Sequence, residues 1–379
     1  MRIAVPAETQ GAETRVAATP ETVRKFKGLG AEVVIETGAG KASGITDAEY
    51  EGAGATIAKT AAEALAGAAI VLKVRRPGEG EIAGLPAGAL VVATMDPYGN
   101  EAQVEALAKA NVAAFAMEFM PRITRAQVMD VLSSQANLAG YRAVIDAAAE
   151  YGRALPMMMT AAGTVPAAKI FVMGVGVAGL QAIATARRLG AIVTATDVRP
   201  ATKEQVESLG AKFLAVEDEE FKQAQTAGGY AKEMSKEYQA KQAELTASHI
   251  AKQDIVITTA LIPGRPAPKL ISAAMVESMK PGSVIVDLAV ERGGNCELAK
   301  AGEVVTTDNG VKIVGHLNVP GRLPATSSSL YAKNLYAFVE TLIDKAEKKL
   351  AVNWDDELVK ATALTKDGAV IHPNFAPKA

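Results

Sequence analysis

Three glycines and one aspartate stand at spacings that suit the binding of a diphosphate and a ribose. The glycines form the pattern Gly174-x-Gly176-x-x-Gly179 directly after an apolar run, and Asp197 ends the next apolar run, 23 residues after Gly174. The first glycine of such a loop permits a tight turn, the second admits a pyrophosphate, and the third allows close helix–strand packing. The following helix directs amides and dipole at the phosphates. Because a terminal carboxylate accepts ribose hydroxyls, we predict an NAD(H) site.

The residues around this motif leave two alternatives open. A glycine turn between a strand and a helix also occurs for structural reasons alone, although here strand, glycines, helix, strand and acid stand in register. Arg199 lies two residues beyond Asp197 and could pair with the 2′-phosphate of NADP(H). Asp197 occupies the usual hydroxyl-binding position and repels a 2′-phosphate, so we expect NAD(H) to be preferred.

The composition excludes several classes of protein. Of 379 residues, 49% are hydrophobic and 22% charged, with a formal net charge of −2. An electrostatic nucleic-acid binder would show a clustered basic excess. One cysteine and three histidines exclude an intrachain disulfide and argue against a metal site, so we expect a reducing, cytoplasmic compartment. The uncharged run 170–186 fits a buried strand and helix better than a membrane span.

The elements that must position the motif alternate short apolar runs with amphipathic helical stretches, which is typical of parallel α/β sheets. At this length we expect two domains. Strands are predicted at 2–5, 31–35, 69–74, 89–94, 112–117, 169–173, 192–196, 212–216, 254–258, 283–287 and 312–315. A Leu-Gly-Ala junction recurs at 29–31, 189–191 and 209–211, where the glycine can end a helix at positive φ.

Further stretches complete the predicted plan. A helix over 125–153, opened by a capping box between Thr124 and Gln127, bridges the two domains. Another helix over 328–346 precedes a hairpin that turns at Asp367-Gly368. We expect the tail to return to the first domain, which gives two Rossmann-like domains around a cleft, the second inserted in the first. Their residues are 1–135 plus 318–379, and 136–317.

Residues 217–250 interrupt this alternation. They are polar, of mixed charge, and contain Gly228-Gly229-Tyr230. A connection of this length is usually functional or mobile. The simpler interpretation is a solvated surface helix with i,i+4 charge pairs, and from the residues alone we favour that interpretation.

Several segments resemble a known family. MRIAVPAETQGAETRVAATPETV and MGVGVAGLQAIATARRLGAIVTATD are similar to the alanine dehydrogenase and pyridine nucleotide transhydrogenase superfamily. MPRITRAQVMDVLSSQANLAGYRAV, PMMMTAAGTVPAAK and TAGGYAKEMSKEY narrow the resemblance to the NAD(H)-binding first domain of proton-translocating transhydrogenase, as a separate alpha subunit. The resemblance extends over essentially the whole chain.

The resemblance implies a function and an assembly. Hydride would pass from NADH on this chain to NADP⁺ on a partner subunit, coupled to proton translocation by membrane subunits. The chain would form a homodimer and lie peripherally on the cytoplasmic face of the membrane through those partners. The implied cofactors are NAD(H) here and NADP(H) on the partner, without a metal.

The resemblance also implies roles for residues at matching positions. The loop that holds the nicotinamide and faces the partner would contain Arg122, Ile123, Thr124, Arg125, Gln127, Asp130 and Ser133. The adenosine half would be lined by Val177, Asp197, Val198, Arg199 and Leu261. Gly229 and Tyr230 would lie on a mobile loop at about 217–250 that closes over the nucleotide, in place of the surface helix.

Spacing alone favours a simpler interpretation of the nicotinamide loop. If the loop is helical, Gln127, Asp130 and Ser133 span about 120° of one face, enough to serve one ligand. Gln127 could instead only complete the capping box, while Asp130 merely favours the helix N-terminus. The family resemblance reverses this preference.

Two other classes of function stay open. Arg15 and Lys73 match positions at which alanine dehydrogenases hold the substrate carboxylate, but residues 93–100 lack the expected histidine and Glu291 replaces an aspartate. Amine oxidation needs a proton acceptor, for which His316 is the one stand-in, whereas hydride exchange between nicotinamides needs only alignment and exclusion of water. The missing histidine favours the transhydrogenase. A regulatory NAD sensor would differ in failing to exchange hydride with an NADP(H)-bearing partner.

Overall fold

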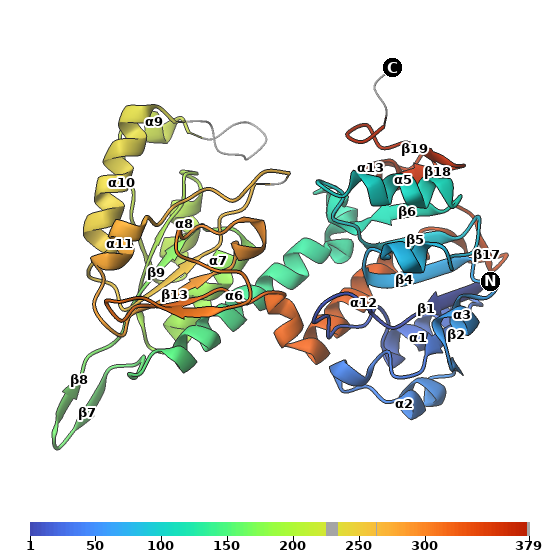
Figure 1. The fold of residues 1–379 in the computed structure, drawn as a ribbon, viewed down its shortest axis with the longest axis horizontal. Coiled ribbons are helices and arrows are strands. Elements are labelled where there is room, and N and C mark those ends of the chain that lie inside the picture. The colour runs from blue at the N-terminus through green and yellow to red at the C-terminus, as the bar shows by residue number, and fades with distance from the viewer. Residues whose placement is uncertain (225–233, 263, 377–379) are drawn as a thin grey trace. The chain divides into compact units, whose positions relative to one another are not determined.

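The computed structural model describes residues 1–224, 234–262 and 264–376. The chain divides into two compact units, unit 1 with Met1–Gln135 and Pro320–Ala379, and unit 2 with Ala136–Val319. Each unit is built on a mainly parallel sheet flanked by helices (Figure 1). The predicted α/β class with two Rossmann-like sheets is confirmed, while a cleft between two functional domains stays a prediction.

Unit 1 contains a six-stranded parallel sheet in the order β3-β2-β1-β4-β5-β6. Its strands are β1 (Arg2–Val5), β2 (Glu32–Glu36), β3 (Thr56–Ala58), β4 (Ile70–Arg75), β5 (Leu90–Thr94) and β6 (Ala113–Ala116). The connecting helices are α1 (Pro20–Gly28), α2 (Asp47–Gly52), α3 (Ala61–Leu65), α4 (Glu79–Ile82) and α5 (Glu101–Lys109). Only β3 lies outside the predicted strands of this sheet, because three residues are too few to show a period.

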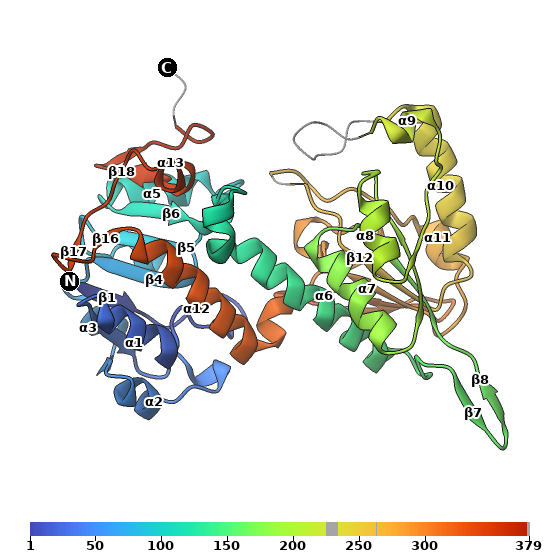
Figure 2. The same cartoon turned by 180° about the vertical axis from the view of Figure 1, so that it is seen from behind.

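The C-terminal segment completes unit 1. Helix α12 (Pro324–Glu340) lies beside α1 (Figure 2), and its Tyr331 and Phe338 are buried in the same cluster as Phe115 of β6. Helix α13 (Glu357–Thr362) and the short pairs β16 (Ile343–Asp344) with β17 (Lys349–Leu350) and β18 (Thr365–Lys366) with β19 (Ala369–Val370) follow. Asp367 and Gly368 turn the last hairpin at φ of 49° and 78°, as predicted.

Unit 2 contains a seven-stranded sheet in the order β11-β10-β9-β12-β13-β15-β14, with only β14 antiparallel. Its strands are β9 (Lys169–Met173), β10 (Ile192–Thr196), β11 (Lys212–Phe213), β12 (Ile255–Thr258), β13 (Val284–Asp287), β14 (Val304–Thr306) and β15 (Lys312–Val314). Its helices include α7 (Val177–Arg188), α8 (Thr202–Ser208) and α11 (Ala273–Glu277). β14 and the hairpin of β7 (Met158–Thr160) with β8 (Gly163–Val165) lie outside the predicted strands.

Alternation along the central strands of unit 2 produces two core clusters. Ile170 and Val172 pack in one cluster with Ile183 of α7, whereas Phe171 packs in the other with Val276 of α11. Both faces of the sheet are therefore covered. This explains why its strands are continuous apolar runs in the sequence.

The three Leu-Gly-Ala junctions are confirmed. Leu29, Leu189 and Leu209 are the C-cap residues of α1, α7 and α8. The glycines that follow them have φ of 79°, 86° and 76°. A side chain strains this left-handed conformation, so glycine there ends each helix and starts the next strand.

The segment after β6 differs from the predicted single helix. Residues Thr124–Met129 form a 3-10 helix, η3, and α6 begins only at Val131 and runs to Glu150. The predicted capping box is wrong, because Ile123 is the N-cap and no side-chain hydrogen bond caps η3 in this described stretch. The backbone at Asp130 is extended, with ψ of 92°, so residues 127, 130 and 133 do not share one helical face.

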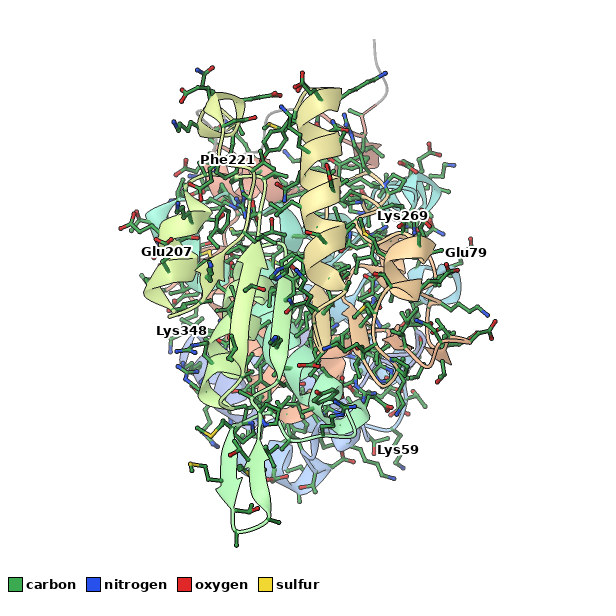
Figure 3. All side chains as sticks on the ribbon, turned by 90° about the vertical axis from the view of Figure 1, so that its left-hand side faces the viewer. Lys59, Glu79, Glu207, Phe221, Lys269 and Lys348 are labelled. Carbon is green, nitrogen blue, oxygen red and sulfur yellow. The ribbon has the colours of Figure 1, made fainter. Side chains whose placement is uncertain are left out.

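The segment 217–250 contains two helices, α9 (Glu219–Lys222) and α10 (Lys236–Ile250). Phe221, labelled in Figure 3, stacks on Tyr238 with the rings nearly parallel and 6.4 Å apart. A helix thus occupies the second half of the segment that the family resemblance implies to be a mobile loop. Gly229 and Tyr230 lie outside the described residues.

Candidate nucleotide site

The glycine loop connects β9 to α7 and has no room for side chains at two of its glycines. Gly174 has φ of 100°, and a Cβ there would lie 2.6 Å from Thr259 Oγ1. A Cβ on Gly179 would lie 1.9 Å from the carbonyl oxygen of Gly174. Both distances are shorter than van der Waals contact, so these glycines are fixed by the turn and by helix–strand packing.

Gly176 is different, because neither its backbone nor a neighbour requires glycine. It is the N-cap of α7 with φ of −82°, and a Cβ there would meet no atom of the described chain within 4 Å. The open side of this loop therefore has room for a ligand that approaches the backbone closely. The amides at the start of α7 suit a diphosphate, so these residues fit the diphosphate of NAD(H).

Asp197 follows β10 and holds the glycine loop against the strand end. Its Oδ2 accepts a hydrogen bond of 2.7 Å from the amide of Val175. Its Oδ1 accepts bonds from the amide and the Nε of Arg199, at 2.9 and 2.8 Å, and Arg199 Nη2 donates to Oδ2 at 2.9 Å. The side-chain hydrogen bond from Asp197 raises the pKa of Arg199.

Two residues that the sequence interpretation missed support the other side of the loop. Thr259 Oγ1 donates to the carbonyl of Gly174 at 3.0 Å. Asn295 is buried and brackets Ala260, accepting from its amide at 3.0 Å and donating to its carbonyl at 2.9 Å. The next residue, Leu261, is about half exposed. A polar residue directly after the central strand β12 is the signal that could have pointed to Thr259, because ligands bind at the carboxyl ends of parallel strands.

The predicted nicotinamide loop lies in unit 1 and is anchored from below. Ala126 and Met129 are buried, and Asn334 of α12 donates to the carbonyl of Val128 at 2.8 Å. Arg122, Thr124 and Gln127 are exposed, and Val177 and Val198 in unit 2 are exposed as well. The anchoring therefore fixes the backbone of the loop and leaves its polar side chains available to a ligand.

Two members of this loop already have structural partners. Arg125 binds Asp356 through both terminal nitrogens, at 2.7 and 3.0 Å, and also contacts Glu357 at 3.1 Å. Asp130 accepts the amide of Ser133 at 2.9 Å and its hydroxyl at 2.5 Å. Asp130 therefore caps the start of α6, as the simpler interpretation from spacing supposed.

The structure groups the predicted residues into two sets. Residues 122–133 belong to unit 1, whereas Gly174, Gly176, Gly179, the segment 197–199 and Leu261 belong to unit 2. Within unit 2 the glycine loop and Asp197 are joined by hydrogen bonds. That both sets bind one nucleotide remains a proposal.

The residues that would bind an amino acid are engaged with glutamates. Arg15 donates to Glu13 through Nε and Nη2, at 2.7 and 2.8 Å, and to Gln135 through Nη1 at 2.8 Å. Although burial alone would raise it, hydrogen bonds from Arg15 hold the pKa of Glu13 at about 2. The buried Lys73 lies 2.7 Å from Glu81 and 3.6 Å from Glu8. Both cations are therefore paired within unit 1.

The histidines do not form a site. His249 shares a 2.8 Å hydrogen bond with Thr194 and packs edge-on against Phe171, and His372 stacks on Phe119. His316 is half-buried, and Glu291 accepts the amide of Asn318 at 2.7 Å. Among the described residues there is no cluster of three or more His, Cys, Asp or Glu suited to a metal. In the same residues, no helix has the length and apolarity needed to cross a membrane.

Comparisons with known proteins agree with this arrangement. Residues 4–139 match the N-terminal domain, and residues 143–373 the C-terminal domain, described as Alanine dehydrogenase/PNT. The chain is 58% identical over 378 residues to the first of the separate alpha chains of the NAD(P) transhydrogenase of Rhodospirillum rubrum, covering 98% of each chain. The crystal structure of a transhydrogenase from Sinorhizobium meliloti has a TM-score of 0.89 and 64% identity, over 98% of this chain and 100% of that one. A solved L-alanine dehydrogenase has a TM-score of 0.83 and 26% identity, over 99% and 98%.

Proposed function

Because the chain belongs to the alanine dehydrogenase/PNT family, we propose that it is the separate NAD(H)-binding alpha subunit of a proton-translocating NAD(P) transhydrogenase. The observation that carries this proposal is the match over 98% of both chains to a transhydrogenase alpha chain. The glycine loop and Asp197 supply the NAD(H)-binding chemistry that such a subunit needs. Hydride passes from NADH on this chain to NADP⁺ on another subunit, and membrane-spanning subunits couple the exchange to proton translocation.

The binding roles follow from the two sets of residues. The amides beside Gly176 hold the diphosphate, Asp197 accepts the ribose hydroxyls, and Leu261 borders the adenosine half. The exposed Arg122 and Gln127 position the nicotinamide, with Asp130 and Ser133 beside them. Hydride exchange between two nicotinamides requires alignment at about 3–3.5 Å and exclusion of water rather than a protein base. Gly229 and Tyr230 belong to the loop that closes over the nucleotide.

The assembly is a further element of the proposal. Other transhydrogenase subunits hold this chain at the cytoplasmic face of a membrane, and two copies of it form a homodimer. Support for the dimer comes from the β7–β8 hairpin, which extends beyond the sheet of unit 2 (Figure 1). Met157, Met158 and Met159 on this hairpin are 57%, 42% and 79% exposed. Adjacent exposed apolar side chains are a common mark of a protein interface.

The main test is a hydride-exchange assay with the NADP(H)-binding partner. NADH and NADP⁺ should exchange hydride in the mixture without any amino acid. Gln127→Asn should slow this exchange more than it weakens NADH binding, because a residue beside the reacting rings acts on their geometry. Gln103→Asn in α5 is a control for the same change elsewhere. A mixture that binds both nucleotides but exchanges no hydride would leave only the sensor function.

Alanine dehydrogenation is the second candidate, favoured by the structural similarity to L-alanine dehydrogenase. It conflicts with the pairing of Arg15 and Lys73 to glutamates and with the absence of histidine from residues 93–100. L-Alanine and NAD⁺ should therefore give no useful NADH formation, even at alkaline pH. Robust alanine-dependent NADH formation that His316→Ala abolishes would establish the dehydrogenase instead.

A further inference from the structure

The carboxylate expected to receive the ribose has no free acceptor position in this structure. A carboxylate offers about four lone-pair sites. Four donors occupy them on Asp197, namely the amides of Val175 and Arg199 and the Nε and Nη2 of Arg199. A ribose hydroxyl can therefore donate to Asp197 only if one of these bonds is released.

The four donors differ in how easily they leave. The amide of Val175 belongs to the glycine loop and the amide of Arg199 to the turn after β10, so displacing either one moves the backbone. The guanidinium is the end of a long side chain that is 30% exposed, whereas the side chain of Asp197 is 7% exposed. Rotation about side-chain bonds is sufficient to release it. Its further bond to the carbonyl of Val175, at 3.1 Å, closes the same edge of the site.

We propose that the Arg199 guanidinium is an internal competitor for the ribose position on Asp197, and that its displacement determines both NADH affinity and the discrimination against NADPH. This inference rests on the proposed function, because it concerns the same NAD(H) site. Arg199 is thus a specificity-determining residue that acts through Asp197.

The charges explain the discrimination. When NADH binds, its two ribose hydroxyls replace the two guanidinium bonds at Asp197, and Arg199 is released towards solvent. A 2′-phosphate attracts Arg199 but would leave the Asp197 carboxylate without its cation beside a second anion. The cation that could bind the phosphate of NADPH is therefore held by the carboxylate that repels it.

Titration calorimetry of NADH and NADPH against single and double variants tests the inference. Arg199→Ala should bind NADH about three- to tenfold more tightly, because the displaced ion pair is partly exposed and of modest strength. Asp197→Asn should bind NADPH at least about tenfold more tightly than the wild type, because Arg199 is then free for the phosphate. The double variant Asp197→Asn with Arg199→Ala should lose that gain.

Controls separate this mechanism from its alternatives. Lys203→Ala removes a nearby cation that pairs with Glu217, not with Asp197, and should leave NADH affinity unchanged. Arg199→Gln repeats the test if circular dichroism shows that the alanine variant is unfolded. Unchanged or weaker NADH binding in both Arg199 variants, or an equal gain in Lys203→Ala, overturns the inference. If the wild type binds no NADH, the proposed function itself fails.

Discussion

The glycines of the nucleotide loop are small for different physical reasons, and the structure separates them one residue at a time. Gly174 adopts a left-handed conformation, and Gly179 lies against a carbonyl of the same loop. Gly176 meets neither limit, so only a ligand explains its size. Loss of stability and loss of binding can therefore be assigned to different positions in one motif.

Gly176→Ala and Gly179→Ala test this separation. Gly176→Ala should keep the free energy of unfolding close to that of the wild type, yet weaken NADH binding roughly tenfold or more, since each lost hydrogen bond to a charged phosphate is worth about 1.5–3 kcal/mol. Gly179→Ala should lower the free energy of unfolding by about 1–3 kcal/mol as well, because its Cβ overlaps the carbonyl of Gly174. Thermal melts and NADH titrations measure the two effects, and unaltered NADH binding by folded Gly176→Ala would contradict the site.

Glu118 provides a pH prediction in unit 1. Burial raises its pKa from 4.5 to about 7, even though the amides of Met95 and Asp96 donate to it. The folded state then binds a proton that the unfolded state lacks between these pH values. Its contribution to stability is complete below about pH 4.5 and is lost as the pH rises through 7. Glu118→Gln should therefore gain stability relative to the wild type between pH 5 and pH 8.

The comparison between variant and wild type isolates this carboxyl from other titrating groups. Burial lowers the pKa of His249 and of His372, which gives the opposite pH dependence in both proteins. Denaturant unfolding at several pH values gives the stability difference directly. A difference that stays constant from pH 5 to pH 8 would show that Glu118 keeps its ordinary pKa.

At the scale of elements, the start of α6 has two possible reasons to contain an aspartate. Asp130 caps the helix through the amide of Ser133, and the family resemblance also implies a role at the nicotinamide. Asparagine caps helices about as well as aspartate but has no charge, whereas alanine lacks both properties. Two substitutions can therefore distinguish the structural role from the chemical one.

Asp130→Ala should lower the free energy of unfolding by about 1 kcal/mol through loss of the cap. Asp130→Asn should unfold like the wild type and still slow hydride exchange if the charge acts at the nicotinamide. Chemical denaturation and the exchange assay give the two readouts. Wild-type exchange by Asp130→Asn would reduce Asp130 to a helix cap.

At the scale of the whole molecule, the β7–β8 hairpin predicts an assembly. Replacing Met158 and Met159 together with aspartate should convert the proposed homodimer to a monomer, because charge is costly in an apolar interface. Sedimentation velocity measures the mass, and Ile371→Asp, which alters a similarly exposed apolar residue in unit 1, should remain dimeric. A wild type that sediments as a monomer at micromolar concentration would refute the dimer.

The central strands of both sheets, the Leu-Gly-Ala junctions and the glycine loop could all be predicted from the sequence. Each is encoded locally: buried parallel strands are continuous apolar runs, and positive φ restricts a position largely to glycine. The sequence did not predict β3 and β14, whose three residues carry too little pattern, or the break at Asp130. A helix can restart there because a side-chain cap offsets the lost backbone bonds, and helical periodicity does not encode that competition.

The availability of charged residues, in contrast, depends on how the chain folds. Arg15, Lys73 and Arg125 are candidate ligand-binding residues in the sequence, yet each is paired with glutamate or aspartate in the structure. Asp356 lies 231 residues from Arg125, so no local pattern could reveal that pair. The same holds for Asp197, whose identity predicts a ribose site but whose saturation by Arg199 and Val175 depends on how a loop and a strand end meet. Residue type states what a side chain can bind, and packing determines what it already binds.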